Sequence, residues 1–171
     1  MQEKIAVIGA GSWGTALASL LGASGHKVTI YAMEEEIING INTNHENPRY
    51  LQGILLSPNV QASSFSNIPN MPEKHIVWAI PTQFSRRVAE ENREVLSGKD
   101  IIIATKGIEI ATGSLVIQML EEAADAEYSI LSGPSFAKEV ALNKPTAVSI
   151  ASKDLKVAEW WQRAFSAPNF R

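Results

Sequence analysis

The chain contains no cysteine among its 171 residues. Disulfide bridges and metal sites built on thiolates are therefore excluded, and the absence agrees with a reducing compartment. No apolar run reaches the roughly 18 residues that a membrane helix needs. The first residues, MQEKIAVIGAG, lack a basic segment leading into an apolar stretch of signal-peptide length. We therefore predict a cytoplasmic protein that is not inserted in a membrane.

The chain also lacks an excess of charge of either sign. Its formal net charge is −3, with acidic and basic residues interspersed. Nucleic acids and anionic membranes bind strongly basic surfaces, so neither is an expected partner. His26, His45 and His75 stand singly in a predicted turn, a loop and a strand edge, and we predict no metal site.

Short apolar runs rich in β-branched residues recur along the chain, and helical patterns separate most of them. Their hydrophobicity is continuous, as in strands buried on both faces of a parallel sheet. With 45% apolar residues, residues 1–171 suit one α/β domain with a doubly wound, mainly parallel, Rossmann-like sheet. The predicted strands are 4–9, 27–32, 75–80, 100–105, 128–132 and 145–152, and the predicted helices are 13–24, 34–43, 83–97, 114–124, 135–142 and 153–165.

Residues 44–74 interrupt this alternation of strands and helices. The segment is long and contains Pro48, Pro58, Pro69 and Pro72. Long connections of this kind are often functional loops, and a plain surface excursion is the alternative. The sequence leaves both interpretations open.

Three glycines, Gly9, Gly11 and Gly14, join the first predicted strand to the first predicted helix in KIAVIGAGSWG. In this G-x-G-x-x-G pattern the first glycine permits a tight turn, the second admits a pyrophosphate, and the third lets helix and strand pack closely. The free N–H groups of the helix then hold the phosphates. The pattern and its context predict dinucleotide binding, with a tight turn as the alternative, and the missing Gly-Lys-Ser/Thr ending excludes a P-loop.

Met33 and Glu34 follow the second predicted strand. A carboxylate at this place accepts hydrogen bonds from the adenosine ribose and repels a 2′-phosphate. Because neither residue is basic, we predict NAD as the preferred cofactor and NADP as the second option. The acidic run Glu34–Glu36 also suits a helix N-terminus, and the two roles are compatible.

Two further segments follow strands at the sheet edge where ligands bind in such folds. Lys106, in ATKGIE, can carry a substrate phosphate or polarise a carbonyl, and an ordinary exposed lysine is the alternative. In LSGPSFAKEV, Pro134 suits the first position of a helix, with Ser132 or Gly133 as its cap. The Ser135 hydroxyl would then lie beside a second helix N-terminus.

The segments IAVIGAGSWGTALA, NPRYL, AIPTQ, ATKGIE and SGPSFAKEVA, followed by PTA, together resemble the bacterial NAD(P)-dependent sn-glycerol-3-phosphate dehydrogenases in order and spacing. The resemblance spans nearly the whole chain. It implies reversible hydride transfer between NAD(P)H and dihydroxyacetone phosphate, giving sn-glycerol 3-phosphate for glycerophospholipid synthesis. It places Ser12, Trp13 and Ala137 at the cofactor, Gly133 and Ser135 at the substrate, and Lys106 at both, as the catalytic residue of this chain.

The resemblance also implies a helical second domain that this chain does not contain. In the family that domain supplies the acid/base lysine and an arginine and an asparagine that grip the substrate, so the chain alone is expected to be inactive. Many members carry basic residues where this chain has Met33 and Glu34, which again favours NAD. The oligomeric state stays open, with a homodimer as one option.

Two other classes of protein are the alternatives. Ketopantoate-type or opine-type reductases also join a Rossmann domain to a helical domain, but the TKG and SGPSFA segments argue against them. A non-catalytic, redox-sensing NAD-binding module is the second alternative.

Overall fold

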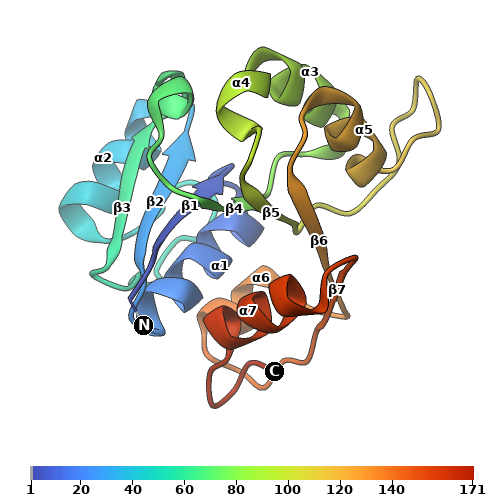
Figure 1. The fold of residues 1–171 in the computed structure, drawn as a ribbon. Coiled ribbons are helices and arrows are strands. Elements are labelled where there is room, and N and C mark those ends of the chain that lie inside the picture. Colours follow the sequence, from blue (N-terminus) through green and yellow to red (C-terminus); the bar gives the residue numbers. More distant parts are fainter. Residues whose placement is uncertain (1) are drawn as a thin grey trace.

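A seven-stranded sheet forms the centre of the protein, whose computed structural model describes residues 2–171 (Figure 1). The strand order is β3-β2-β1-β4-β5-β6-β7. Neighbouring strands run parallel except β6 and β7, which are antiparallel. The doubly wound, mainly parallel sheet expected from the sequence is confirmed. The strands are β1 (Lys4–Ile8), β2 (Lys27–Ala32), β3 (Val60–Ser64), β4 (His75–Trp78), β5 (Asp100–Ile103), β6 (Glu127–Ser132) and β7 (Ser149–Ser152).

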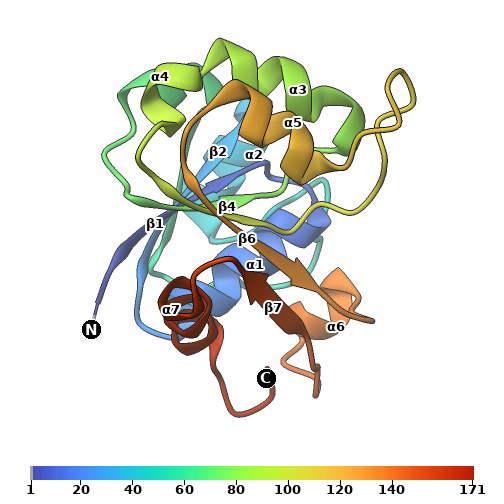
Figure 2. The ribbon, with the colours of Figure 1, turned by 45° about the vertical axis from the view of Figure 1, so that its right-hand side comes forward.

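Helices cover both faces of the sheet, as Figure 2 shows. One hydrophobic cluster joins the strands to α1, α2, α6 and α7, and a second joins them to α3, α4, α5 and the 3-10 helix η1. The helices are α1 (Ser12–Ala23), α2 (Glu35–Asn44), η1 (Phe65–Asn70), α3 (Thr82–Glu91), α4 (Arg93–Leu96), α5 (Val116–Ala123), α6 (Ala137–Ala141) and α7 (Leu155–Phe165).

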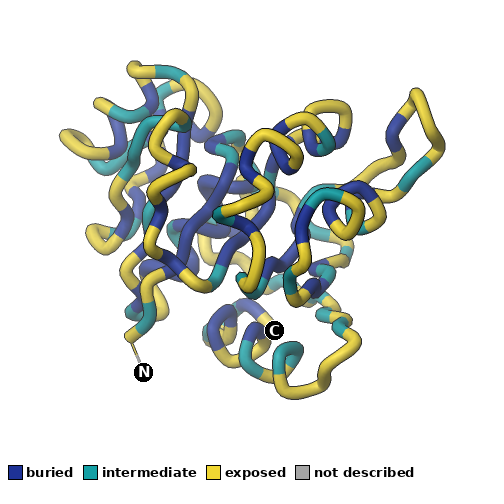
Figure 3. The backbone as a smooth tube through the Cα atoms, turned by 45° about the horizontal axis from the view of Figure 1, so that its top comes forward, coloured by how far each residue is buried: buried dark blue, intermediate teal, exposed yellow. Residues whose placement is uncertain are grey.

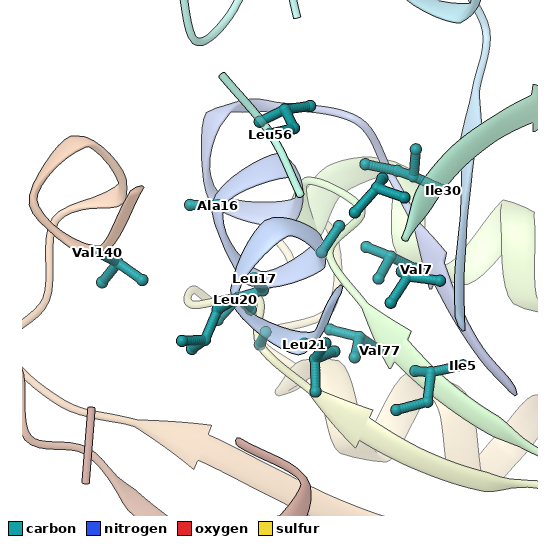
Figure 4. Close-up of a cluster of buried hydrophobic side chains, with 14 of the residues drawn as sticks. Ile5, Val7, Ala16, Leu17, Leu20, Leu21, Ile30, Leu56, Val77 and Val140 are labelled. Atoms are coloured by element: carbon teal, nitrogen blue, oxygen red, sulfur yellow. The ribbon is translucent and has the colours of Figure 1, made fainter. Parts of the chain in front are cut away.

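The central strand β1 is buried along both faces because each face meets helices. Ile5 and Val7 belong to the cluster around Leu17 of α1 (Figure 4), whereas Ala6 and Ile8 belong to the cluster on the opposite face. Burying a large aliphatic side chain contributes about 1.5–3 kcal/mol. Figure 3 shows the buried residues gathered along the central strands. The continuous apolar runs of the sequence therefore reflect helices on both sides.

The sequence pattern gives no sign of the edge strand β3. Only Val60 is buried in this strand, so it has no apolar run. It pairs in parallel with β2, from Val28 with Val60 to Ala32 with Ser64. Residues 44–74 are therefore not a plain surface excursion, since they contain one edge of the sheet together with η1.

The predictions for two other elements are partly wrong. Residues 145–152 were expected to form a buried strand, but β7 begins at Ser149 and its residues alternate between exposed and half-buried, because it forms the other edge of the sheet. Residues 83–97 were expected to form one helix, but the chain leaves helical geometry at Asn92, between α3 and α4. The Asn92 side chain there donates a hydrogen bond to the Val88 carbonyl at 2.8 Å.

Candidate functional site

The order of the strands reverses between β1 and β4. These two strands are neighbours in the sheet, although β2 and β3 lie between them in the sequence. In doubly wound sheets, ligands bind beyond the carboxyl ends of the strands at such a switch point. The glycine turn after β1 and the segment after β4 both lie there.

The three glycines of the turn serve different purposes. Gly9 has φ +112°, and an added Cβ would lie 2.6 Å from the carbonyl oxygen of Ala79. A Cβ on Gly14 would overlap the carbonyl oxygen of Gly9. Gly11 has φ −67°, and no atom lies within 4 Å of a Cβ placed on it. Packing within the chain therefore requires Gly9 and Gly14, whereas Gly11 leaves open space that suits the approach of a pyrophosphate.

The N-terminus of α1 faces this space without a capping side chain. Gly11 is the N-cap residue, and no side chain accepts a hydrogen bond from the first turn. The bond from the Thr15 N–H to the Gly11 carbonyl, at 2.9 Å, begins the helical series. The N–H groups before Thr15 have no partner inside the helix, which makes this end suitable for binding an anion.

Asn47, the first residue of the NPRYL segment and one with no predicted role, holds the glycine turn from behind. This asparagine is fully buried. Its Nδ2 donates hydrogen bonds to the Ala10 carbonyl at 2.9 Å and to Thr15 Oγ1 at 2.8 Å. Its Oδ1 accepts from the N–H groups of Arg49 at 3.2 Å and Tyr50 at 3.0 Å. The loop after α2 is thereby tied to the turn after β1.

Glu34 lies at the end of β2 as predicted, but it has two neighbours from the loop after α2. Its carboxylate accepts a hydrogen bond from the Tyr50 hydroxyl at 3.1 Å and lies 3.6 Å from Nη1 of Arg49. Met33 is 73% exposed. Glu35 and Glu36 occupy the first turn of α2, where acidic side chains suit the helix dipole. A cation is therefore present at this corner, although neither residue 33 nor residue 34 is basic.

A pocket of about 330 Å³ lies beyond the carboxyl ends of β4 and β5. Four separate segments line it: the start of α1, the loops after β4 and β5, and the segment after β6. Larger hollows exist elsewhere, one of about 660 Å³ between α1 and α6, but not at these strand ends. The pocket brings together five residues predicted from the sequence to form the site, namely Ser12, Trp13, Lys106, Ser135 and Ala137.

Lys106 connects two of these segments. Its Nζ donates a hydrogen bond to the Gly133 carbonyl at 2.6 Å, while the residue as a whole stays exposed. Its own carbonyl accepts a bond from Thr82 Oγ1 at 2.9 Å. The next residue, Gly107, has φ +135°, and an added Cβ would lie 2.6 Å from Thr82 Oγ1. The backbone around Lys106 is thus fixed by the first residue of α3.

The AIPTQ segment supplies a second support to the loop that follows Lys106. Gln83 Nε2 donates to the Ile108 carbonyl at 2.9 Å, and Gln83 Oε1 accepts from the Ile110 N–H at 3.0 Å. Arg86, further along α3, binds the largely buried Glu109 carboxylate through Nε and Nη2 at 2.9 to 3.1 Å. These supports come from residues more than 20 positions away, and the sequence motif did not reveal them.

Ser135 and Trp13 complete the pocket. The Ser135 Oγ is buried and has no hydrogen-bond partner among the described residues. Trp13 Nε1 donates to the Ala104 carbonyl at 3.1 Å, which holds the indole near the end of β5. A buried hydroxyl without a partner costs about 1–3 kcal/mol.

The expected helix start at Pro134 is wrong. The helix α6 begins at Ala137, with the extended Phe136 as its N-cap, and it is five residues long. Pro134 and Ser135 precede the helix because the chain between Gly133 and Phe136 stays extended or bent. Ser135 therefore reaches the pocket from a loop rather than from a helix N-terminus.

Two other kinds of site have no support in residues 2–171. Within this range, no group of three or more His, Asp or Glu side chains is arranged to hold a metal ion. None of the helices in the same range combines the length and apolar character that crossing a membrane requires.

Comparisons with known proteins point to one family. Residues 4–158 match the family described as NAD-dependent glycerol-3-phosphate dehydrogenase N-terminus. A protein of Parvibaculum lavamentivorans named glycerol-3-phosphate dehydrogenase (NAD(P)+) is 40% identical, over 99% of this chain and 51% of its own length. A protein of the same name from Citrifermentans bemidjiense is 41% identical, over 100% of this chain and 52% of its own length.

A solved structure shows the same relationship. The crystal structure of glycerol-3-phosphate dehydrogenase from Coxiella burnetii superposes with a TM-score of 0.90 at 28% identity, over 99% of this chain and 53% of that one. The chain spans about half the length of the curated relatives it matches.

Proposed function

Since this chain belongs to the NAD-dependent glycerol-3-phosphate dehydrogenase family, we propose that residues 1–171 form the dinucleotide-binding domain of such an enzyme. The proposed reaction is hydride transfer between NAD(P)H and dihydroxyacetone phosphate, giving sn-glycerol 3-phosphate. The observation that carries this proposal is the single pocket shared by Trp13, Lys106 and Ser135. The family match favours this activity over ketopantoate-type or opine-type reduction and over a redox-sensing role.

In the proposed complex the dinucleotide lies across the switch point. The N-terminus of α1 and the open space at Gly11 hold the pyrophosphate, and Glu34 faces the adenosine ribose. Ser12, Trp13 and Ala137 would then adjoin the nicotinamide, which supplies or accepts the hydride. The uncapped helix end and the lack of any atom near a Cβ at Gly11 support this placement.

The substrate would occupy the side of the pocket formed by Lys106 and Ser135, next to Gly133, whose carbonyl accepts the hydrogen bond from Lys106. Lys106 is exposed, and its ammonium group can neutralise a phosphate or polarise a carbonyl. The Ser135 hydroxyl lacks a partner and can bind an oxygen of the substrate. These groups supply orientation and charge, and the proton donor is expected outside the residues of this chain.

Two measurements on one sample of the 171-residue chain test this proposal. Fluorescence titration should show NADH binding, because the glycine turn is complete. Oxidation of NADH with dihydroxyacetone phosphate should be absent, because the acid/base lysine of the family is expected outside these 171 residues. Failure to bind NADH would remove the proposed cofactor site, and robust turnover would place the acid/base group within this chain.

We further propose that NAD is preferred over NADP. A 2′-phosphate would bring nearly two negative charges toward the Glu34 carboxylate, at a cost of about 1–3 kcal/mol, or roughly 10- to 100-fold in affinity. Arg49 lies 3.6 Å from that carboxylate and is already paired with it, so it offers the phosphate less than a free guanidinium would. NADH should therefore bind more tightly than NADPH.

Titration of both reduced cofactors at low and high salt tests the preference. Met33→Arg combined with Glu34→Arg should reduce or reverse the difference in affinity between NADH and NADPH. Added salt should weaken that effect. Arg49→Ala serves as the control. It removes the cation that lies beside Glu34, and it should increase the preference for NADH over NADPH. Equal affinities for the two cofactors, or tighter binding of NADPH, in the unchanged chain would contradict the proposal.

A further inference from the structure

We propose that Asn47 is a positioning residue for dinucleotide binding, which fixes the glycine turn and the ribose corner relative to each other. The ribose corner is the group formed by Glu34, Arg49 and Tyr50. This inference rests on the proposed function, because it assumes that the turn binds a pyrophosphate. Asn47 itself is fully buried behind the turn and does not line the pocket.

Hydrogen bonds fix the orientation of the peptide unit between Ala10 and Gly11. The Ala10 carbonyl accepts hydrogen bonds from Asn47 Nδ2 at 2.9 Å and from Thr15 Oγ1 at 3.3 Å, so it points toward Asn47. The peptide bonds of the described chain are all trans. In a trans peptide the N–H points opposite to the carbonyl. Asn47 therefore turns the Gly11 N–H outward, toward the open space beside the N-terminus of α1.

Asn47 also holds the backbone of the loop after α2. The Oδ1 of Asn47 accepts the N–H groups of Arg49 and Tyr50 at 3.2 and 3.0 Å. The side chains of these two residues reach the Glu34 carboxylate, at 3.6 and 3.1 Å. The buried amide of Asn47 thus holds two backbone segments in place, the one that carries Arg49 and Tyr50 and the one at Ala10 and Gly11 that would face the phosphates.

Only a side-chain amide can form all of these hydrogen bonds from position 47. A side-chain amide offers two N–H donors and a carbonyl oxygen with two acceptor positions, and Asn47 uses all four. Aspartate keeps the acceptors but loses the donors, and alanine loses both. Because Asn47 is 0% exposed, bulk water has no access to replace the lost bonds.

The test uses the 171-residue chain with two probes, ADP-ribose and adenosine, titrated by heteronuclear NMR so that each spectrum also reports folding. Asn47→Asp should weaken ADP-ribose binding about 10- to 100-fold and change adenosine binding less than about threefold, because its acceptor side is kept. Thr15→Val removes the neighbouring hydroxyl without adding charge, and it should weaken ADP-ribose binding in the same direction by a smaller factor. Asn92→Ala, which removes another largely buried asparagine far from the turn, should leave both affinities unchanged.

The outcomes separate the two proposals. If the unchanged chain does not bind ADP-ribose, the proposed cofactor site fails. If the unchanged chain binds ADP-ribose but Asn47→Asp and Thr15→Val bind it within about threefold of that affinity, the positioning role of Asn47 is overturned and the proposed function stands. If Asn47→Asp does not fold, the same threefold criterion is applied to ADP-ribose binding by Thr15→Val alone.

Discussion

The two ends of the sheet hold their polar side chains differently. At the carboxyl end Lys106 is exposed and lines an open pocket together with Ser135. At the amino end His75 is enclosed. Its ring stacks on Trp160 of α7 with centroids 3.6 Å apart, and its Nδ1 lies 3.2 Å from the Asp100 carboxylate. The carboxyl end leaves the Lys106 side chain exposed, whereas at the amino end α7 covers the His75 ring.

This difference separates binding from stability. Substitutions at the carboxyl end should change the affinity for ligands with little effect on unfolding. Substitutions under α7, at the amino end, should do the reverse. The following predictions test that separation.

The largest effect is expected for Trp161→Ala. Trp161 is fully buried and stacks on Phe165 at 5.8 Å, so its removal leaves a large cavity. The free energy of unfolding should fall by about 3–5 kcal/mol. Urea denaturation measures this change. The affinity for ADP-ribose, corrected for the folded fraction, should stay the same, and a weaker corrected affinity would show that the two ends are coupled.

Lys106→Ala should have the largest effect on catalysis. In an active enzyme carrying this domain, kcat/KM should fall about 100-fold or more, which corresponds to roughly 3 kcal/mol for a lost charge-assisted contact. Thermal stability should hardly change, because the side chain is exposed. Lys144→Ala, at another exposed lysine, is the matched control. Activity within about twofold of the unchanged enzyme would make Lys106 an ordinary loop lysine.

Two glycines of the same turn should behave in opposite ways. In Gly11→Ala the added methyl group meets no atom of the chain, so the free energy of unfolding should stay within about 0.5 kcal/mol of that of the unchanged chain. The affinity for NADH should fall about tenfold, because the methyl group occupies the space proposed for the pyrophosphate. Gly14→Ala overlaps the Gly9 carbonyl and should destabilise the fold itself. Fluorescence titration and urea denaturation on both variants distinguish the effects. Unchanged NADH binding by Gly11→Ala would mean that no phosphate approaches this position.

The smallest effect concerns pH. Burial lowers the pKa of His75, while Asp100 opposes this shift and Lys74 adds to it; Glu3 and His26 are the other charged neighbours. Because the folded state binds a proton less readily than the unfolded state, stability should be lost as the pH falls below about 6.5. His75→Gln should reduce this loss, measured as unfolding free energy against pH. An identical pH dependence in the variant would exclude His75 as a cause.

The buried centre of the sheet was predictable, whereas its edges were not. The run KIAVIG has apolar residues on both faces, and that pattern alone identifies a strand between two helical layers. In contrast, β3 buries only Val60, so its sequence looks like a loop. The split at Asn92 depends on a side-chain bond to Val88 that residue types do not reveal.

The candidate site shows the same limit. Gly11, Lys106 and Ser135 could be selected because each follows a predicted strand, and the structure brings Lys106 and Ser135 into one pocket. Asn47 and Thr82 stand in the quoted segments NPRYL and AIPTQ, but the sequence assigned neither of them a role, because Ala10 and Lys106, which they bind, lie 37 and 24 positions away along the chain. Contacts of this kind exist only after the strands have paired. Their residue types carry no periodic signal.

The pairing of β1 with β4 also determines when the site can form during synthesis of the chain. Ile5 pairs with His75, about seventy positions later, so the ends of a long loop must meet before these strands join. Gly9 reaches its place beside Ala79 only after that closure. When only the residues up to β3 have emerged from the ribosome, the chain contains the glycine turn but not yet β4 and Ala79, against which the turn packs. The proposed dinucleotide site is therefore complete only after β4 has emerged and paired with β1.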